Sequence, residues 1–573
     1  MTYRQYFIKT VLALTVSSIA RPARILTLVA AYAVVAVIMS WPYVNYREFA
    51  SASYGGDAQL ILWTLAWDNH AVLTRAPLFD ANVFFPAAQS LQYNEHLFGV
   101  SLFTLPWAAA GASPILAYNA TWWLAWVING ITAFALLRRF VGSALASFVG
   151  SLAFVCSFYV MLHAHGHLHL IWLWPVPLSM LLLERWFDTP RLPRLAAWVV
   201  VALLGILTSW YMAVILSVAN AVMALVVATT APRRGVDQLP APAAVWRRRG
   251  LHLALAAVVV AACVYPFARH YVGLRAAPGE AAALSADLAA YLVPPENTIA
   301  GRWWLANIDR QPRSIWGEQT LFAGWIALIL AAVGLAALVR GRHESRRAWV
   351  FPLLTLTGFL LSLGPAPPLL GGALAPFGWL TALPGFGGMR APARFALLLT
   401  LGVAGLAAIG VPAIGRAGGW KRVATAALVP IMLAEWFVVD FPARIPAPQP
   451  IPAIYQTAAV RAARSLVSLP DYRNLPEWAR GGDYLYYSTA HWRPIVNGFG
   501  RAEPPGHAEA MQVINRFPDS ADEIRRLGVQ YVVVHADRFA DHAEPLLARA
   551  RENPACRLVE QLGSDYLFEI VVP

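Results

Sequence analysis

The stretch SASYGGDAQLILWTLAWDNH, residues 51–70, places a carboxylate behind two glycines and ahead of a largely apolar run. If a helix begins near Gly56, the helix dipole keeps the side chain of Asp57 ionised. Asp57 is then either a helix cap, a position that Asp favours, or a general base. Asp68 lies eleven residues further on the same helical stripe, about 16 Å away. The two acids therefore cannot act on one reacting centre, and Asp68 is expected to be solvated or in a salt bridge.

An acid and an imidazole stand side by side in LQYNEHLFG, residues 91–99. Glu95 and His96 could bind a divalent metal or hold the counter-ion of a phosphate. Adjacent residues on a helix point about 100° apart, so at most one of the two faces a site. A cap role for Glu95 is equally open. Tyr93, just before them, is a candidate for substrate binding.

Four histidines alternate in HAHGHLHL, residues 163–170. On a strand all four would share a face and could bind a transition metal. The segment joins two apolar runs, so we expect helix ends and a short turn at Gly166 instead. These imidazoles would then lie near lipid phosphate, with His165 or His167 the candidates for a site.

The stretch GFGGMRAPARF, residues 385–395, precedes a long apolar run. Pro392 suits the first turn of a helix, and Arg390 and Arg394 flank that turn. A helix N-terminus with two arginines is an anion site. The alternative is that both side chains extend to lipid headgroups.

Two further stretches, DLAAYLVPPENT and WGEQTLFAGW, lie between apolar runs. Asp287 and Tyr291 share a helical face and are candidates for substrate contact. Glu318 stands at the mouth of an apolar run, where an ionisable group indicates function.

The composition predicts a polytopic membrane protein. The 573 residues are 58% hydrophobic and 13% charged, about half the charge of a typical soluble chain. The net charge of +13 comes from arginines in short loops, which indicates membrane orientation and excludes a nucleic-acid groove. The three cysteines are far apart, so neither disulfides nor a zinc site is expected. Trp63 and Trp67, spaced i and i+4, predict an anchor at the membrane interface.

Arginine placement predicts about eleven spans with the N-terminus inside. The predicted spans are 24–43, 117–137, 142–161, 170–187, 195–209, 211–229, 251–268, 321–339, 349–363, 395–414 and 423–440. Residues 97–110 are too short to span and predict a re-entrant helix. The outer side then carries the loops 45–116 and 270–318, within a membrane domain 1–440, and a small α/β domain, 441–573. In that domain SADEIRRLGVQYVVVH predicts a capped helix and a strand, and CRLVEQL and DYLFEIVV predict two more strands.

In this order the segments GGDAQLILW, LQYNEHLFG, YLVPPENT, GEQTLFAGW and LPGFGGMRAPARF resemble the GT-C superfamily of membrane glycosyltransferases. Within it, the chain most resembles poorly characterised bacterial proteins related to the YfhO-like group. The likeness runs over most of residues 24–440, and the tail also fits that group.

The resemblance implies a sugar transfer that inverts the anomeric centre, from a polyprenyl-phosphate donor to an envelope glycan, lipid or protein. It implies Asp57 as general base, with Glu95 or Glu318 as a second acid. The donor phosphate would contact Arg390, Arg394, His96, His165 and His167. Asp57 and Glu95 holding Mg²⁺ or Mn²⁺ is a further alternative. The implied place is the bacterial inner membrane, with the working face and the C-terminal domain periplasmic. Competing classes are a transporter or flippase of a lipid-linked glycan and a non-catalytic scaffold of envelope assembly.

Overall fold

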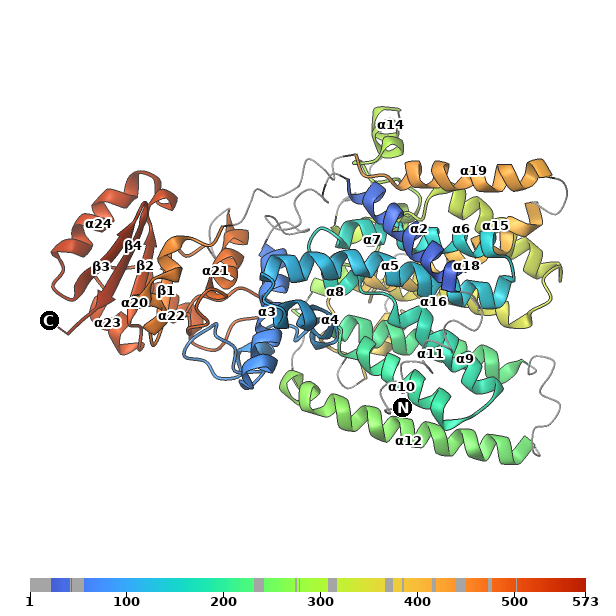
Figure 1. The fold of residues 1–573 in the computed structure, drawn as a ribbon, viewed down its shortest axis with the longest axis horizontal. Coiled ribbons are helices and arrows are strands. Elements are labelled where there is room, and N and C mark those ends of the chain that lie inside the picture. Colours follow the sequence, from blue (N-terminus) through green and yellow to red (C-terminus); the bar gives the residue numbers. More distant parts are fainter. Residues whose placement is uncertain are drawn as a thin grey trace. The chain divides into compact units, whose positions relative to one another are not determined.

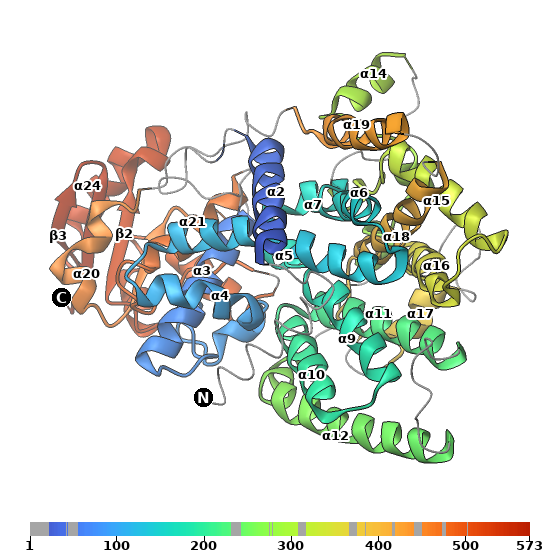
Figure 2. The same ribbon diagram turned by 45° about the vertical axis from the view of Figure 1, so that its right-hand side comes forward.

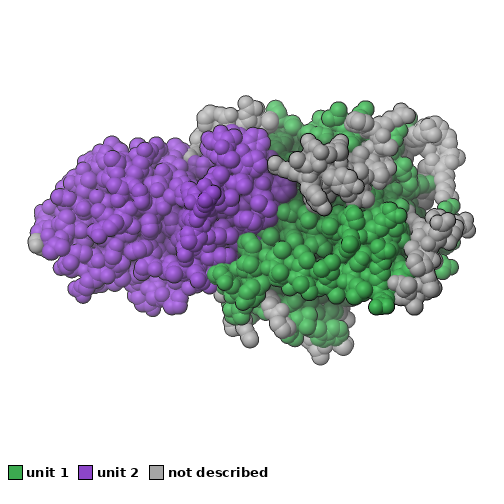
Figure 3. All heavy atoms as spheres, turned by 60° about the horizontal axis from the view of Figure 1, so that its bottom comes forward, with its two compact units in different colours: residues 1–45, 122–164, 170–444 green, residues 46–121, 165–169, 445–573 purple. Residues whose placement is uncertain are grey.

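The computed structural model describes most of the chain in two compact units. The described residues are 22–41, 43, 56–230, 242–273, 276–277, 279–307, 317–365, 375–383, 386–414, 419–439, 450–472, 477–500 and 502–572. Unit 1 consists of residues 1–45, 122–164 and 170–444, and unit 2 of residues 46–121, 165–169 and 445–573. Figure 3 colours the two units. Each unit is described by itself.

Unit 1 is a bundle of apolar helices around α18 (Figures 1 and 2). Its helices are α2 (Pro22–Ser40), most of α5 (Pro114–Val141), α6 (Ala144–Val155), α7 (Phe158–His163), α9 (Pro175–Asp188), α10 (Leu192–Ile206), α11 (Trp210–Thr229), α12 (Pro242–Ala268), α13 (Glu280–Ala283), α14 (Ile299–Asn307), α15 (Trp325–Val339), α16 (Val350–Ser362), α17 (Pro376–Thr381), α18 (Ala396–Ile414) and α19 (Gly419–Trp436). Short 3-10 turns join them at η3 (Arg269–Tyr271), η4 (Leu288–Tyr291), η5 (Gly317–Gln319), η6 (Arg346–Trp349) and η8 (Pro392–Phe395).

Small residues let α18 approach its neighbours closely. A Cβ on Gly334 of α15 would lie 2.0 Å from the carbonyl oxygen of Leu406, and one on Gly410 of α18 would lie 2.0 Å from that of Leu330. The two backbones are therefore in direct contact, as is usual where lipid gives no hydrophobic drive between helices. The segment Pro392–Pro412 is 94% buried, whereas Val245–Tyr271 is 11% buried.

The chain is a multi-pass membrane protein by the length and composition of its helices. Among the described residues, five helices are long and apolar enough to cross a membrane: Ala23–Ser40, Pro114–Val141, Trp210–Thr229, Val245–Tyr271 and Pro392–Pro412. Shorter apolar helices occupy several other predicted spans, including Ala144–Val155, Leu192–Ile206 and Trp325–Val339. The count of eleven spans stays a prediction.

A buried ionic network ties three elements of unit 1 together. Arg139 at the end of α5 lies 2.9 Å from Glu184 and 2.9 Å from Asp188, both on α9. Arg347 of η6 lies 2.8 Å from Glu184 and 2.7 Å from Asp188. The side chain of Glu184 is fully buried. Two acids and two arginines neutralise one another, which buried charges require.

Unit 2 joins the first loop region to the C-terminal residues. The loop region contributes α3 (Gly56–Thr74), η2 (Ser90–Tyr93), α4 (Phe98–Ala109) and the start of α5, and α8 (Leu168–Ile171) begins in this unit. Helix α3 packs against α4 and against α21 (Gly481–Ser488). A Cβ on Gly482 would lie 2.8 Å from the carbonyl oxygen of Gly56, so these two helices touch backbone to backbone. Residues 45–116 were expected to belong to the membrane domain, whereas the described residues 56–116 group with the tail by their contacts.

Helix α3 begins at Gly56 as predicted. The prediction that Trp63 and Trp67 anchor this helix at the membrane interface is wrong. Trp63 is fully buried and donates to Asn82 Oδ1 at 3.2 Å, and Trp67 donates to the carbonyl oxygen of Leu78 at 2.8 Å. Asp68 is also wrongly predicted, because it is neither solvated nor ion-paired. Its buried Oδ2 accepts from Ser101 Oγ at 2.5 Å, and burial raises the pKa of Asp68 well above its ordinary value. Helices α4 and α21 cover both sides of α3, which removes these side chains from water.

The C-terminal part of unit 2 is a small α/β domain with a four-stranded sheet in its described residues, ordered β1-β2-β4-β3 (Figure 1). The strands are β1 (Leu466–Leu469), β2 (Tyr531–His535), β3 (Cys556–Leu562) and β4 (Asp565–Ile570). β1 and β2 are parallel, and the other pairs are antiparallel. The remaining elements are η10 (Ala453–Gln456), α20 (Ala458–Ala462), η11 (Trp478–Arg480), α22 (His507–Ile514), α23 (Ala521–Arg526), η12 (Ala536–Arg538), η13 (Ala540–His542) and α24 (Ala543–Glu552).

The three predicted strands are confirmed as β2, β3 and β4, and the predicted helix as α23. The expected cap is absent, because the Ser520 hydroxyl donates to the carbonyl oxygen of Val513 instead. Alternate residues of the strands face α22, α23 and α24, where Val532, Val534 and Phe568 enter the main core.

The opposite face of the sheet carries a buried polar chain. His535 Nδ1 lies 2.6 Å from Asp565 Oδ1, and His535 Nε2 lies 2.8 Å from the Tyr455 hydroxyl. That hydroxyl is 2.6 Å from Ser468 Oγ. Burial lowers the pKa of His535. The neutral imidazole therefore donates to the acid and accepts from the phenol, which satisfies each buried group.

Candidate functional site

Asp57 and His167 form an accessible acid–imidazole pair in unit 2. Asp57 lies in the first turn of α3, where the helix dipole favours its charged form. Its Oδ2 is 3.3 Å from Nε2 of His167. The Asp57 side chain is 51% exposed and that of His167 is 28% exposed. An exposed carboxylate oriented by a neighbouring imidazole can take a proton from a bound hydroxyl.

His167 owes its place to the break in the histidine segment. As predicted, α7 ends at His163, a turn covers residues 164–166, and α8 begins at Leu168. His167 stands between the turn and α8, with its ring 5.8 Å from that of His169. His165 in the turn is half-buried, whereas His169 is 5% exposed.

Glu95, His96 and Tyr93 lie at the entry of α4 in unit 2. Nδ1 of His96 accepts from the backbone N–H of Phe98 at 3.1 Å, so the imidazole satisfies a donor of the first helical turn. His96 is 1% exposed, and burial lowers its pKa to about 3. Tyr93 packs edge-on against Phe84 at 5.9 Å. Glu95 is half-buried. His96 is thus a neutral acceptor in this structure.

Unit 1 contains a second polar cluster, centred on Arg394. Its guanidinium contacts Oε1 of Glu318 through Nε at 2.9 Å and through Nη2 at 2.7 Å. It also lies 4.4 Å from the ring centroid of Tyr211. His163 Nε2 is 3.9 Å from Glu318 Oε2, and the Tyr159 ring lies 4.5 Å from the His163 ring. The pair is mostly buried, with side-chain exposures of 7% for Arg394 and 14% for Glu318.

Arg390 is the more accessible of the two predicted anion-binding arginines. Its Nη1 donates to Oε1 of Glu280 at 3.0 Å, and its side chain is 36% exposed. The Tyr211 hydroxyl accepts from the backbone N–H groups of Arg390 and Ala391, both at 3.0 Å. Tyr211 therefore positions this segment through both its ring and its hydroxyl.

Asp287 and Tyr291, the predicted substrate contacts, are engaged within unit 1. The Asp287 carboxylate accepts from the backbone N–H of Ala289 at 3.0 Å and caps η4. The Tyr291 hydroxyl lies 2.5 Å from Ser362 Oγ and is buried. Gln319, next to Glu318, accepts from the Asp287 backbone N–H at 2.7 Å. These contacts join the loop 270–318 to the bundle.

The residues that the sequence analysis missed are Tyr211, Glu280 and His163. Tyr211 follows Ser209, whose side chain caps α11, and it was treated as the end of a span. An aromatic residue at the outer end of a span is a common interfacial anchor. The sequence around Tyr211 therefore does not distinguish it from an ordinary anchor. His163 was grouped with three other histidines, and its contact with Glu318 depends on the tertiary structure.

The chain has the GT-C fold, which it shares with a solved glycosyltransferase. The cryo-EM structure of arabinofuranosyltransferase AftD from Mycobacteria is similar over 96% of this chain, with 15% identity and a TM-score of 0.58. This chain spans 40% of the length of that one. No protein-family model matches the sequence, and no curated protein matches it significantly.

Two crystal structures are also similar. ArnT from Cupriavidus metallidurans in the apo state matches over 95% of this chain and 97% of its own, with 13% identity and a TM-score of 0.46. The apo oligosaccharyltransferase of Archaeoglobus fulgidus matches over 90% of this chain and 70% of its own, with 12% identity and a TM-score of 0.46. At such identities the AftD likeness shows the fold alone.

Proposed function

We propose that this chain transfers a sugar from a polyprenyl-phosphate donor to an acceptor outside the cytoplasm, with Asp57 as general base. The observation that carries the proposal is the half-exposed Asp57 carboxylate at a helix N-terminus, 3.3 Å from His167. A carboxylate held ionised and oriented is what proton abstraction from a hydroxyl requires. An acid–imidazole pair such as Asp57 and His167 could serve several reactions, and the GT-C fold favours sugar transfer among them.

In the proposed step the acceptor oxygen attacks the anomeric carbon while Asp57 takes the hydroxyl proton. The bond between the anomeric carbon and the phosphate oxygen breaks, and polyprenyl phosphate leaves with the electron pair. Attack from the face opposite the leaving group inverts the anomeric centre. His167 keeps the Asp57 carboxylate in position, so we assign it as a positioning residue.

Within unit 1, taken by itself, we propose Arg390 as a phosphate-binding residue. Its contact with Glu280 uses one guanidinium nitrogen, and a guanidinium has five N–H donors in a planar fork that suits phosphate. Arg394 has its charge balanced by Glu318. We therefore propose that Glu318 holds Arg394 and Tyr211 in place, in preference to serving as a second base.

A divalent cation remains a separate proposal. Mg²⁺ and Mn²⁺ prefer oxygen ligands, and the partner of Asp57 is an imidazole. In the described part of the chain, no three His, Cys, Asp or Glu residues gather as a metal site. The described residues around Asp57 do not by themselves form a ligand set, so the proposed step is written without a metal. Activity measured with EDTA and with added Mg²⁺ or Mn²⁺ tests this point.

The decisive experiment uses the full chain in detergent, without a second membrane compartment. Labelled polyprenyl-phosphate pentose and hexose donors are supplied with envelope extracts as acceptors, arabinofuranose first because of the likeness to AftD. We expect transfer by the wild type and a loss of about 10²- to 10⁴-fold in Asp57→Asn, the usual contribution of a general base.

The matched control is Asp522→Asn. Asp522 is also a first-turn helix acid, on α23, and its side chain is 56% exposed. It shares the dipole interaction of Asp57 but not its role, so its variant should transfer at the wild-type rate. Full activity of Asp57→Asn would overturn the proposal. If the wild type transfers no sugar but moves the lipid-linked donor across the membrane of liposomes, the chain is a flippase instead.

A further inference from the structure

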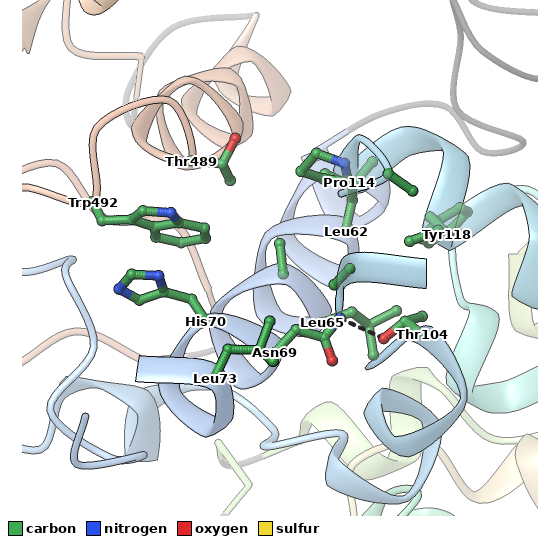
Figure 4. A pocket seen from close by; sticks show the side chains of 14 residues that line it. Leu62, Leu65, Asn69, His70, Leu73, Thr104, Pro114, Tyr118, Thr489 and Trp492 are labelled. Carbon is green, nitrogen blue, oxygen red and sulfur yellow. Dashed lines mark hydrogen bonds between the residues drawn. The ribbon is translucent and has the colours of Figure 1, made fainter. Parts of the chain in front are cut away.

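Unit 2 contains a pocket whose lining includes neither Asp57 nor His167. It has a volume of about 240 Å³ and is formed by the second half of α3, by α4, by the start of α5 and by the turn after α21. Figure 4 shows that His70 and Trp492 lie on one side of it and that Thr104 and Tyr118 lie on the other. The pocket therefore combines the first loop region with the C-terminal residues of the same unit.

The lining of this pocket carries no formal charge. Among the described residues that form it there is no Asp, Glu, Lys or Arg. Its polar groups are an amide, three hydroxyls and the imidazole of His70, whose pKa is lowered by burial. A phosphate or another anion would enter without a counter-charge, which is unfavourable. The pocket is thus suited to a neutral ligand that has both apolar and hydroxyl groups.

Two stacked aromatic rings, called the His70–Trp492 plate below, form one wall of the pocket. The rings of His70 and Trp492 are stacked, with centroids 4.3 Å apart and planes at 16°. Trp67 packs against both, at 5.6 Å and 5.9 Å. Trp492 has a φ of 56°, a left-handed conformation that is rare for a bulky residue. Such strain concentrates at functional positions, and here it places the indole on the pocket. Aromatic ring faces carry partial negative charge and so attract the C–H groups of a sugar ring.

Asn69 supplies the second, independent observation. It is 4% exposed, and its Nδ2 donates to Thr104 Oγ1 at 2.7 Å. The Thr104 hydroxyl donates in turn to the carbonyl oxygen of Ser101 at 3.0 Å, which fixes the orientation of the amide. Oδ1 of Asn69 has no hydrogen-bond partner among the described residues. A buried acceptor without a donor is costly, and a ligand hydroxyl in the pocket would satisfy it.

We propose that this pocket binds a neutral sugar ring of the acceptor glycan. The ring would stack on the His70–Trp492 plate and donate a hydroxyl to Oδ1 of Asn69. This inference rests on the proposed function, because it takes the acceptor to be a glycan. A prenyl or acyl chain fits less well, since it would leave the Asn69 acceptor unsatisfied.

The test measures binding, independently of transfer. The full chain in detergent, carrying Asp57→Asn so that no product forms, is titrated with neutral tetrasaccharides derived from arabinan, mannan, galactan and glucan. Saturation-transfer NMR identifies the bound ring protons, and calorimetry gives the affinity. We expect at least one tetrasaccharide to bind through ring C–H protons. Asn69→Leu and Trp492→Ala should each weaken that binding by about tenfold or more.

The matched control is Trp107→Ala, because Trp107 is on α4, is 43% exposed and does not line the pocket. This variant should bind as the parent does. Asn69→Leu keeps a branched side chain at this position and removes only the amide, so it complements Trp492→Ala, which removes a large ring. Absence of saccharide binding, or equal binding by the Asn69→Leu and parent chains, overturns the proposal. So does pocket-dependent binding of a polyprenol instead. Transfer by Asp57→Asn would defeat the proposed base while leaving this binding result intact.

Discussion

Nε2 of His167 lies 3.3 Å from Oδ2 of Asp57, although the two residues come from distant segments of the chain. Both side chains reach solvent, so the pair can meet a substrate. The acid sits in the first turn of α3, and the imidazole is one of the groups that orient it.

Replacing His167 tests this orientation. We expect His167→Ala to lower kcat for sugar transfer by about tenfold, with a smaller change in KM, because the base remains but loses its partner. His167→Gln should recover much of the rate, since its amide can still donate to Asp57. Wild-type kcat in His167→Ala, or a loss of rate that His167→Gln does not recover at all, would contradict the assignment.

Replacing Glu318 tests the buried pair with Arg394. Glu318→Gln leaves Arg394 buried without its counter-charge, and breaking a buried pair costs about 3–5 kcal/mol. We expect a clear fall in the thermal unfolding temperature of the detergent-solubilised protein. Glu280→Gln is the control, because Arg390 and Glu280 are 36% and 26% exposed and more exposed pairs contribute about 1 kcal/mol or less. Equal effects of the two variants would show that Arg394 does not depend on Glu318.

The network of Arg139, Glu184, Asp188 and Arg347 gives a prediction for unit 1. Glu184→Gln removes the acid that both arginines contact. The buried guanidinium of Arg347 and the partly exposed one of Arg139 then share Asp188. We expect a loss of about 3–5 kcal/mol, seen as a lower unfolding temperature. Glu344→Gln, at an exposed residue, should change nothing. An unfolding temperature unaffected by Glu184→Gln would mean that the helix ends are held by apolar packing alone.

His96 predicts an acid-sensitive step in unfolding. Burial lowers its pKa to about 3, below the value of about 6.5 expected in the unfolded chain. The neutral imidazole therefore contributes stability that is fully present above about pH 6.5 and is lost as the pH falls towards 3, by up to about 1.4 kcal/mol per pH unit.

The comparison is with His96→Asn, whose side-chain oxygen can also accept from a nearby backbone N–H and does not titrate in this range. Unfolding temperatures of the two full-length proteins are measured at several pH values. We expect the wild type to lose stability relative to the variant below about pH 6.5. Parallel pH dependence of the two proteins would show that His96 is not the titrating group.

The local features of the chain follow from the sequence because they depend on neighbouring residues. The glycines ahead of an apolar run begin α3 at Gly56 and place Asp57 in its first turn. Gly166 lies in the turn that separates the histidines. Short apolar runs in YVVVH and DYLFEI, with helical periodicity elsewhere, also distinguish the tail from the membrane bundle.

The partners of these residues were decided by the tertiary structure. The spacing of apolar residues determines which face of a helix is apolar, and the caps determine where the helix begins and ends. Neither determines which other helix covers that face. Coverage of α3 by α4 and α21 buried Asp68 and Trp63, which by local pattern alone could face water or the interface. The same long-range packing brings His167 to Asp57, Glu318 to Arg394 and Trp492 to His70. The sequence by itself thus determined where the chain places an acid at a helix start, and only the tertiary structure decided what that acid contacts, because contacts between distant segments depend on how whole faces pack.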